Sequence, residues 1–358
     1  MLSLKETQAA QGAQHASDGI PLHFGDQLAE YEAAQQHVAL LDRSHEGRLQ
    51  LTGADRLEVL HRISTNDLHT MQPGEGRATV FTKANARIID RLVVYNLPEQ
   101  TLALAGPGRG GAVANMLQRQ VFFNDDMQIA DITPQTAQFT LHGPQASQVL
   151  NTLGIHVESA QSQLHAKQTT LGGVDVIVAQ RKPLVGPYWS IIVLHKEAAN
   201  LVWQAITQAG QSHGLRPAGS LTYNALRIQS GRPAIGRELT ADYLPLEVGL
   251  WDEVSFTKGC YTGQEIIARM ESRSRLAKVL VRLQLPHAVE TPASLHQAGR
   301  TVGTVTSNVA APDGTVYAIG VVKTSVVASD DPMELESGES VSFLELAAAP
   351  PPAAMLNA

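Results

Sequence analysis

One short pattern occurs twice in this chain, about 90 residues apart, and it restricts the folds that the chain can adopt. An apolar-x-Leu-x-Gly strand pattern ends at Gly53 and again at Gly143, and a helical pattern follows each copy. The helices carry the pair Val59-Leu60 in the first copy and Val149-Leu150 in the second. Two copies of a strand–helix unit are too few for a solenoid. The repeat therefore predicts two related halves that both contain helices and strands.

Toward the C-terminus the pattern changes to all-β. Val279, Val281 and Leu283 alternate with polar residues, as half-buried strands do. Pro312-Asp313-Gly314 lies between two further apolar runs and is a turn signal. We therefore predict a small antiparallel β-barrel over residues 276–346.

At 358 residues, the chain is longer than one typical domain. The patterns divide it into five segments. These are a flexible N-terminus at 1–20, a first α+β domain at 21–135, a second α+β domain at 136–275, the barrel at 276–346 and a disordered, proline-rich tail at 347–358.

Composition excludes several classes of protein. Apolar residues make up 43% of the chain and charged residues 17%, which is typical of globular proteins. The net charge of −7 argues against a sequence-independent nucleic-acid binder. No apolar run reaches the roughly 20 residues that span a bilayer, and residues 1–17 lack the features of a signal peptide. We therefore expect a cytoplasmic monomer without nucleic-acid or membrane partners.

The histidines and the cysteine do not form a metal-binding pattern. The chain has one cysteine, which can neither form an internal disulfide nor ligate an iron–sulfur cluster alone. Its histidines are scattered and lack the spacing of metal ligands. We expect no resident metal ion.

The run from Gly106 to Gly111 fits the G-x-G-x-x-G pattern of dinucleotide-binding loops. It follows a predicted strand, opens a predicted helix and has Asp131 about 20 residues further on. Its neighbours, however, are short strands of antiparallel type rather than a series of βαβ units. A glycine-rich strand-to-helix turn is the favoured interpretation, and a nicotinamide dehydrogenase is the alternative.

Asp90 interrupts an otherwise apolar strand at residues 88–95. If Ile89 faces inward, Asp90 faces the opposite side of the strand. Its carboxylate then lies at an exposed edge, lines a polar pocket, or pairs with Arg87 or Arg91. The pattern alone leaves these alternatives open.

The single cysteine, Cys260, lies in the octapeptide Lys-Gly-Cys-Tyr-Thr-Gly-Gln-Glu at residues 258–265. Thr262 and Glu265 fit a capping box, which predicts that a helix begins directly after the cysteine. Lys258 and the positive end of that helix both favour the thiolate form. Cys260 is therefore a candidate reactive thiol, and the alternative is a small buried side chain before an ordinary helix.

Arginines lie on both sides of the octapeptide, among them Arg227 and Arg269. On a solvated face they have no special role. Near a pocket, their planar guanidinium groups bind carboxylates in a bidentate manner.

The octapeptide resembles the signature of the YgfZ-type folate-binding proteins, which are relatives of the glycine cleavage T-protein, an aminomethyltransferase. The resemblance covers all but about 20 residues at each end of the chain. It includes the matches Leu41-Asp42-Arg43-Ser44, Asn66-Asp67, Ile88-Ile89-Asp90, Gly231-Arg232-Pro233 and Val302-Gly303-Thr304-Val305-Thr306-Ser307.

The resemblance implies a three-lobed α+β fold of T-protein type, with two related α+β domains and a C-terminal antiparallel β-barrel. It implies a bound tetrahydrofolate or derivative, and a role in iron–sulfur cluster assembly or repair. The partners would be the assembly machinery or client iron–sulfur enzymes. It assigns working roles to Cys260 and Lys258, and folate contacts to Arg227, Tyr188, Tyr261, Gln264, Glu265 and Arg269.

The resemblance also keeps a second function open. Asp90 matches the catalytic aspartate of the T-protein, which implies a folate-dependent aminomethyltransferase as the alternative. Two departures weaken that alternative. T-proteins usually carry paired acids where this chain has Asp90-Arg91, and the glutamates that hold the pterin are absent from residues 181–189. Tyr188 remains as a residue that can stack on the pterin.

Overall fold

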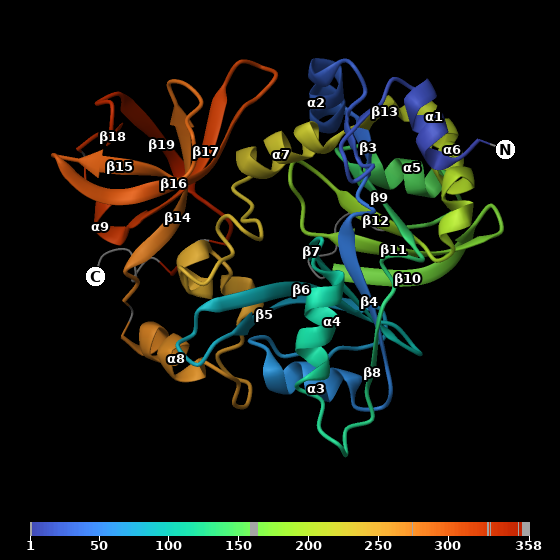
Figure 1. Cartoon of the computed structure of the whole chain (residues 1–358), viewed down its shortest axis with the longest axis horizontal. Coiled ribbons are helices and arrows are strands. Elements are labelled where there is room, and N and C mark those ends of the chain that lie inside the picture. The colour runs from blue at the N-terminus through green and yellow to red at the C-terminus, as the bar shows by residue number, and fades with distance from the viewer. Residues whose placement is uncertain are drawn as a thin grey trace. The chain divides into compact units, whose positions relative to one another are not determined.

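The computed structural model describes residues 2–157, 164–273, 275–327, 329, 331–349 and 351–352 (Figure 1). Its internal contacts divide the chain into two compact units. The first unit comprises Met1–Val59, His69–Arg77 and Leu92–Leu226, and the second comprises Leu60–Leu68, Ala78–Arg91 and Arg227–Ala358. The boundaries that we predicted at residues 135 and 275 divide the chain by sequence pattern rather than by contacts, and they stay a prediction.

An eleven-stranded sheet, counted over the described residues, dominates the first unit. Its order is β13-β3-β9-β12-β11-β10-β5-β6-β7-β4-β8, with β13 parallel to β3. Residues 78–82 of β5 and residues 88–91 of β6 belong to the second unit. The strands are β3 (Val38–Asp42), β4 (Glu46–Thr52), β5 (Glu75–Thr82), β6 (Ile88–Asn96), β7 (Thr101–Pro107), β8 (Gln128–Asp131), β9 (Ala137–His142), β10 (Leu164–Leu171), β11 (Val174–Arg181), β12 (Tyr188–Val193) and β13 (Leu215–Ala218).

Helices of the first unit bury their apolar faces against this sheet. Alternate residues of β9 and β12, such as Phe139 and Ile191, point to one face, where they meet Val149 and Trp203 from the helices. The rings of Phe139 and Trp203 lie edge to face, with centroids 5.1 Å apart. The helices are α1 (Leu4–Ala10), α2 (Gln27–Gln36), α4 (Gly110–Gln118), α5 (Ala146–Thr152) and α6 (Ala199–Gly210), and α3 (Arg56–Ile63) and α7 (Ser220–Gln229) continue into the second unit.

Both copies of the predicted strand–helix unit form. Strand β4 leads through Gly53 into α3, and β9 leads through Gly143 into α5. The two glycines adopt φ angles of +99° and +122°. A Cβ atom at Gly143 would lie 2.6 Å from the carbonyl oxygen of His37. The glycine of the pattern is therefore required by the turn itself.

The N-terminus differs from its prediction. Instead of a flexible segment, helix α1 and the strands β1 (Gln14–His15) and β2 (Pro21–His23) form there. Ser3 and Glu6 close a capping box, in which each side chain accepts from the other residue's backbone N–H. Gln8 is buried on the same helix. The Ser-x-x-Glu spacing was the signal for this helix, and the polar composition concealed it.

The predicted barrel forms in the second unit, and Figure 1 shows its strands in orange and red. It closes in the order β14-β17-β16-β15-β18-β19. The predicted alternation is observed, because Val279, Val281 and Leu283 join one hydrophobic core. The strands are β14 (Lys278–Leu285), β15 (Ala293–Gln297), β16 (Arg300–Ala310), β17 (Val316–Lys323), β18 (Met333–Leu335) and β19 (Ser340–Leu346).

The start of the predicted disordered tail is held by backbone hydrogen bonds. The N–H of Ala347 donates to the carbonyl oxygen of Leu280 at 2.9 Å, and that of Ala349 donates to Gly249 at 3.0 Å. The prediction is therefore wrong for these two residues. Residues 353–358 of the predicted tail lie outside the described residues.

The glycine-rich run at 106–111 is a strand-to-helix turn. Strand β7 ends at Pro107 and α4 begins at Gly110. Strand β7 pairs in antiparallel fashion with both β4 and β6. A dinucleotide site of this type requires neighbouring parallel strands, so the dehydrogenase alternative finds no support here.

No helix within the described part of the chain is both long and apolar enough to cross a bilayer.

The turn at Gly143 gives a test of the fold. We expect Gly143→Ala to destabilise the protein by roughly 2–4 kcal/mol, because a left-handed backbone and a clash with a carbonyl oxygen act together. Gly154→Ala is the matched control at the other end of α5. Its φ is also positive, at +76°, but a Cβ there meets nothing within 4 Å. Equal losses in chemical denaturation would refute the role of the clash.

Candidate functional site

The octapeptide at 258–265 forms an irregular loop in the second unit and then enters helix α8 (Gln264–Ser272). The hydroxyl of Ser255 accepts the backbone N–H groups of Thr257 and Lys258, at 3.4 and 3.2 Å, and so shapes the start of the loop. The residue before α8 is Gly263, with φ of +88° and no side-chain cap. The predicted capping box of Thr262 and Glu265 is therefore wrong.

Lys258 binds the end of another helix. Its ammonium group donates to the carbonyl oxygens of His61, Ser64 and Asn66, with distances of 2.6 Å to Ser64 and 3.2 Å to Asn66. Helix α3 ends at Ile63, and the last carbonyl groups of a helix lack partners within it. A cation is favoured at that negative end. Lys258 therefore fastens the cysteine loop to the C-terminus of α3.

This geometry changes the role that we predicted for Lys258. The sequence suggested that its charge favours the thiolate of Cys260. In the structure, three carbonyl oxygens surround that charge, and the ammonium nitrogen also lies 5.2 Å from the ring centre of Tyr261. Lys258 is consequently a residue that positions the loop.

The residues after Cys260 hold the loop on its other side. The ring of Tyr261 enters the hydrophobic core of the second unit, and burial raises its pKa to about 12. The carbonyl oxygen of Thr262 accepts from the hydroxyl of Thr82 at the end of β5. A Cβ atom on Gly263 would lie 2.7 Å from the carbonyl oxygen of Lys83. The loop therefore packs against the turn between β5 and β6.

Cys260 itself is exposed. The residue before it, Gly259, is also exposed, and a Cβ atom there would meet nothing within 4 Å. The neighbours of the thiol are thus anchored, whereas the thiol and the backbone beside it face open space. The alternative of a small buried cysteine is wrong.

Asp90 lies on β6, in the part of the strand that belongs to the second unit. It is fully buried, whereas Ile89 is 40% exposed. The inward side of the strand is therefore the one that carries Asp90. One of its carboxylate oxygens accepts the backbone N–H of Arg91 at 2.8 Å.

The two arginines beside Asp90 pair with other acids. Arg91 makes a bidentate ion pair with the buried Glu253, at 2.6 and 2.7 Å. Arg87 lies 3.7 Å from a carboxylate oxygen of Glu247. Sequence reasoning missed Glu253, because it lies in a short apolar run without a recognisable motif.

Arg227 belongs to a buried network in the second unit. Its guanidinium group donates to the hydroxyl of Ser307 at 3.1 Å and lies 3.4 Å from Glu238. Glu238 also accepts from the hydroxyl groups of Thr306 and Ser307, at 2.7 and 2.6 Å. These bonds tie the segment after α7 to strand β16. Arg227 contributes to packing here, and its side chain is only 7% exposed.

Helix α8 carries further polar groups of the site, with Gln264 and Glu265 in its first turn and Arg269 in its last. The amide of Gln264 donates to the carbonyl oxygen of Lys258 at 3.4 Å. Glu265 and Arg269 form an i,i+4 ion pair at 2.6 Å, and their side chains are 84% and 54% exposed. Both remain available to a ligand, since exposed pairs of this kind are weak.

Tyr188 lies on β12 in the first unit and is 2% exposed. The ring of His142 lies 3.9 Å away between centroids, and the guanidinium carbon of Arg181 lies 5.3 Å from the ring centre. Burial raises the pKa of the Tyr188 phenol, and Arg181 opposes that rise. In this conformation, Tyr188 presents no exposed ring face on which a pterin can stack.

Sequence reasoning missed the structural roles of Thr65 and Asn66, although Asn66 belongs to a quoted match. The hydroxyl of Thr65 donates to the carbonyl oxygen of Glu253 at 2.7 Å. The side chain of Asn66 donates to Ala78 and Asp252, at 2.8 and 3.2 Å. The polar pair Thr65-Asn66, which lies just after the end of α3, was the sequence signal that could have identified these two residues. Together they place the end of α3 against the segment that leads to the cysteine.

The residues assigned to folate fit such a ligand only in part. Gln264, Glu265 and Arg269 present polar side chains, whereas Arg227, Tyr188 and Tyr261 are engaged inside the protein. Over the described residues, no group of three His, Cys, Asp or Glu side chains is arranged to hold a metal ion.

Comparisons with known proteins agree on one family. Residues 4–258 match the family model of the GCVT N-terminal domain. A chloroplastic protein of Arabidopsis thaliana named "putative transferase" is 30% identical over 89% of this chain and 73% of its own length. Aminomethyltransferases of Halalkalibacterium halodurans and Streptomyces coelicolor are 27% and 28% identical, over 82% and 87% of this chain and 80% and 85% of theirs.

A solved structure is similar in fold. The crystal structure of glycine cleavage system aminomethyltransferase T from Bartonella henselae superposes with a TM-score of 0.81 at 20% identity, and covers 98% of this chain and 97% of that one. This similarity confirms the predicted α+β fold of T-protein type with its C-terminal antiparallel barrel.

The contacts of Lys258 give a test of its positioning role. We expect Lys258→Met to lower the free energy of unfolding by roughly 1–3 kcal/mol, because it removes the donor of three carbonyl oxygens. We also expect the loop to loosen while the pH profile of Cys260 alkylation by iodoacetamide keeps its midpoint. The rates are measured from pH 6 to pH 10 under native conditions.

Lys83→Met is the control, because it removes an exposed lysine close to the same loop. If Lys258→Met moves the midpoint of the alkylation profile upward and Lys83→Met does not, Lys258 acts on the thiol and the positioning role is wrong.

Proposed function

Because this chain belongs to the family of the GCVT N-terminal domain, we propose that it is a tetrahydrofolate-binding accessory protein for iron–sulfur cluster assembly or repair. Cys260 is its working thiol. This is the role of the YgfZ-type subgroup, whose signature the octapeptide at 258–265 resembles. The partners are the assembly machinery or the iron–sulfur enzymes that it serves.

The observation that carries this proposal is that several residues of the octapeptide are anchored to the protein, whereas its thiol is exposed. Within the second unit, Lys258 holds the loop to the end of α3 and Tyr261 holds it to the hydrophobic core. Thr262 and Gly263 both hold it to the turn between β5 and β6. Cys260 remains exposed between these anchored residues. Fixing a loop costs conformational entropy. We infer that this loop is fixed because it positions its thiol for a partner.

A lone thiol also determines the kind of chemistry. A cluster requires about four ligands, so Cys260 can supply one ligand while a partner protein or a small thiol supplies the others. The exposed, open surroundings of Gly259 and Cys260 suit the approach of such a partner.

The folate part of the proposal rests on the family and on a smaller set of residues. Gln264 and Glu265 in the first turn of α8, and Arg269 in its last turn, present polar groups. A carboxylate and a guanidinium group complement the amino groups and the glutamate tail of a folate. When bound, the folate would supply one-carbon chemistry, whereas these side chains would bind and orient it.

Replacing the thiol tests the central claim. We expect Cys260→Ser, introduced into the host chromosome, to lower iron–sulfur enzyme activity and cluster content several-fold. Thr257→Ala is the matched control, since it alters the same loop and keeps the thiol. Purified Cys260→Ser should still bind tetrahydrofolate with unchanged affinity in a calorimetric titration. Wild-type enzyme activities in the Cys260→Ser host would contradict the proposal.

A second candidate function is aminomethyl transfer, which two observations favour. Relatives over more than four-fifths of the chain are named aminomethyltransferases. Asp90, which matches the catalytic aspartate of the T-protein, is fully buried on β6, and burial suits a carboxylate with a catalytic role.

The two candidates predict opposite results for one assay. Purified protein receives an aminomethylated lipoyl carrier and tetrahydrofolate, and ammonia and methylene-tetrahydrofolate are measured. We expect no turnover above background. Turnover that Asp90→Asn reduces by roughly 100-fold or more, and that Cys260→Ser leaves intact, would establish the transferase instead.

A further inference from the structure

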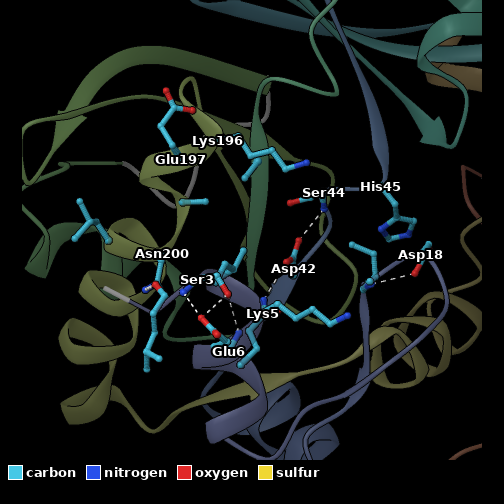
Figure 2. A pocket seen from close by; sticks show the side chains of 18 residues that line it. Ser3, Lys5, Glu6, Asp18, Asp42, Ser44, His45, Lys196, Glu197 and Asn200 are labelled. Carbon is cyan, nitrogen blue, oxygen red and sulfur yellow. Dashed lines mark hydrogen bonds between the residues drawn. The ribbon is translucent and has the colours of Figure 1, made fainter.

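A polar pocket lies within the first unit (Figure 2). Its volume is about 640 Å³. Its walls come from α1, from Asp18–Ile20 before β2, from the turn between β3 and β4, and from residues 196–201 at the start of α6. The pocket exists because the N-terminal segment folds into a helix.

The wall formed by α1 is fixed by side-chain hydrogen bonds. Gln8 donates to the carboxylate of Asp42 at 3.0 Å. Trp203 donates to the side-chain oxygen of Gln11 at 2.9 Å, and Asn200 donates to the carbonyl oxygen of Leu2 at 2.7 Å. These bonds join the helix to β3 and α6, so the pocket is preformed.

Two lysines line the pocket from opposite walls. Lys5 extends from α1 and Lys196 from the segment before α6, and Figure 2 shows both reaching toward the side that carries Asp42, Ser44 and His45. Neither ammonium group has a hydrogen bond or an ion pair within the described residues. The pocket therefore offers two cations that are available to an anionic group.

The same pocket contains a deeply buried carboxylate, that of Asp42. Asp42 is 6% exposed, and its oxygens accept from the N–H of Ser44 at 2.9 Å and from Gln8 at 3.0 Å. It forms no ion pair within the part of the chain that the structure describes. A carboxylate this deeply buried is usually paired with a charge, so it favours a cationic group beside it.

Two further polar atoms of the wall have no partner. The side-chain oxygen of Asn200 is buried without a hydrogen bond among the described residues, and Asn200 is 6% exposed. The Nδ1 atom of His45 is also buried without a hydrogen bond among the described residues. Buried polar atoms are nearly always satisfied, so both indicate a group that binds nearby.

We propose that this pocket binds a short peptide with a free amino and a free carboxyl terminus. The carboxylate of the ligand lies between Lys5 and Lys196, and its ammonium group lies against Asp42. Each end of the ligand thus meets a side chain of opposite charge.

Size and charge exclude other ligands. The volume falls in the range of roughly 300–1,000 Å³ that drug-sized ligands occupy, which suits about two to four residues. A nucleotide is disfavoured, because the carboxylates of Glu6, Asp18, Asp42 and Glu197 repel its phosphates, and because no Phe, Tyr or Trp among the described residues lines the pocket. A polyamine is disfavoured by the two lysines. The inference is independent of the function proposed above.

Trialanine is the probe for a calorimetric titration of the full chain. We expect it to bind with a submillimolar Kd, whereas trialanine blocked at both ends by an acetyl and an amide group gives no heat. The double variant Lys5→Met/Lys196→Met should weaken binding roughly tenfold, with a few-fold loss for each single change. Both lysines are exposed and unbonded, so neither change threatens the fold.

Lys167→Met is the control, because it removes an exposed lysine of the same unit that lies outside this pocket. Asp42→Asn should abolish binding, and its thermal unfolding is measured to show that α1 stays in place. Three results overturn the proposal. These are no heat at about 10 mM trialanine, equal binding of acetyl-trialanine with its free carboxylate, and unchanged binding by the double lysine variant.

Discussion

The arrangement of the site depends on one interaction, the contact between the ammonium group of Lys258 and three carbonyl oxygens at the end of α3. A helix terminus leaves its last carbonyl groups without partners, and a compact cation with three N–H donors satisfies several of them at once. This contact also determines where the next residues lie. Because Lys258 is fixed, Cys260 emerges at a defined place two residues later.

Buried charges elsewhere serve the same purpose of holding segments together. Arg227 and Glu238 join the segment after α7 to the barrel. In the first unit, Glu46 lies between Arg43 and Arg181. Burial alone would raise the pKa of Glu46, but the two arginines lower it to about 2. A buried carboxylate that stays ionised over the whole physiological pH range stabilises the structure. A match to related sequences at such a position therefore indicates a shared fold rather than a shared reaction.

Sequence patterns predicted the fold well where periodicity and glycine geometry decide it. The alternation from Val279 to Leu283 and the turn at Gly143 both reflect local constraints, and both were found. The sequence left open on which side of β6 Asp90 lies, because a strand that is buried at most positions shows no alternation of apolar and polar residues. The carbonyl partners of Lys258 were beyond prediction, since backbone atoms leave no trace in the sequence.

The sequence separation of these partners has a consequence for synthesis. Lys258 lies 192 to 197 residues after the carbonyl groups that it binds. At roughly 5–20 residues per second, the end of α3 leaves the ribosome on the order of 10–40 seconds before its cation does. During that interval the carbonyl groups rely on water, and the second unit still lacks the long C-terminal part that begins at Arg227. The thiol loop therefore reaches its anchored position only late in synthesis, after α3 has already formed its own part of the contact.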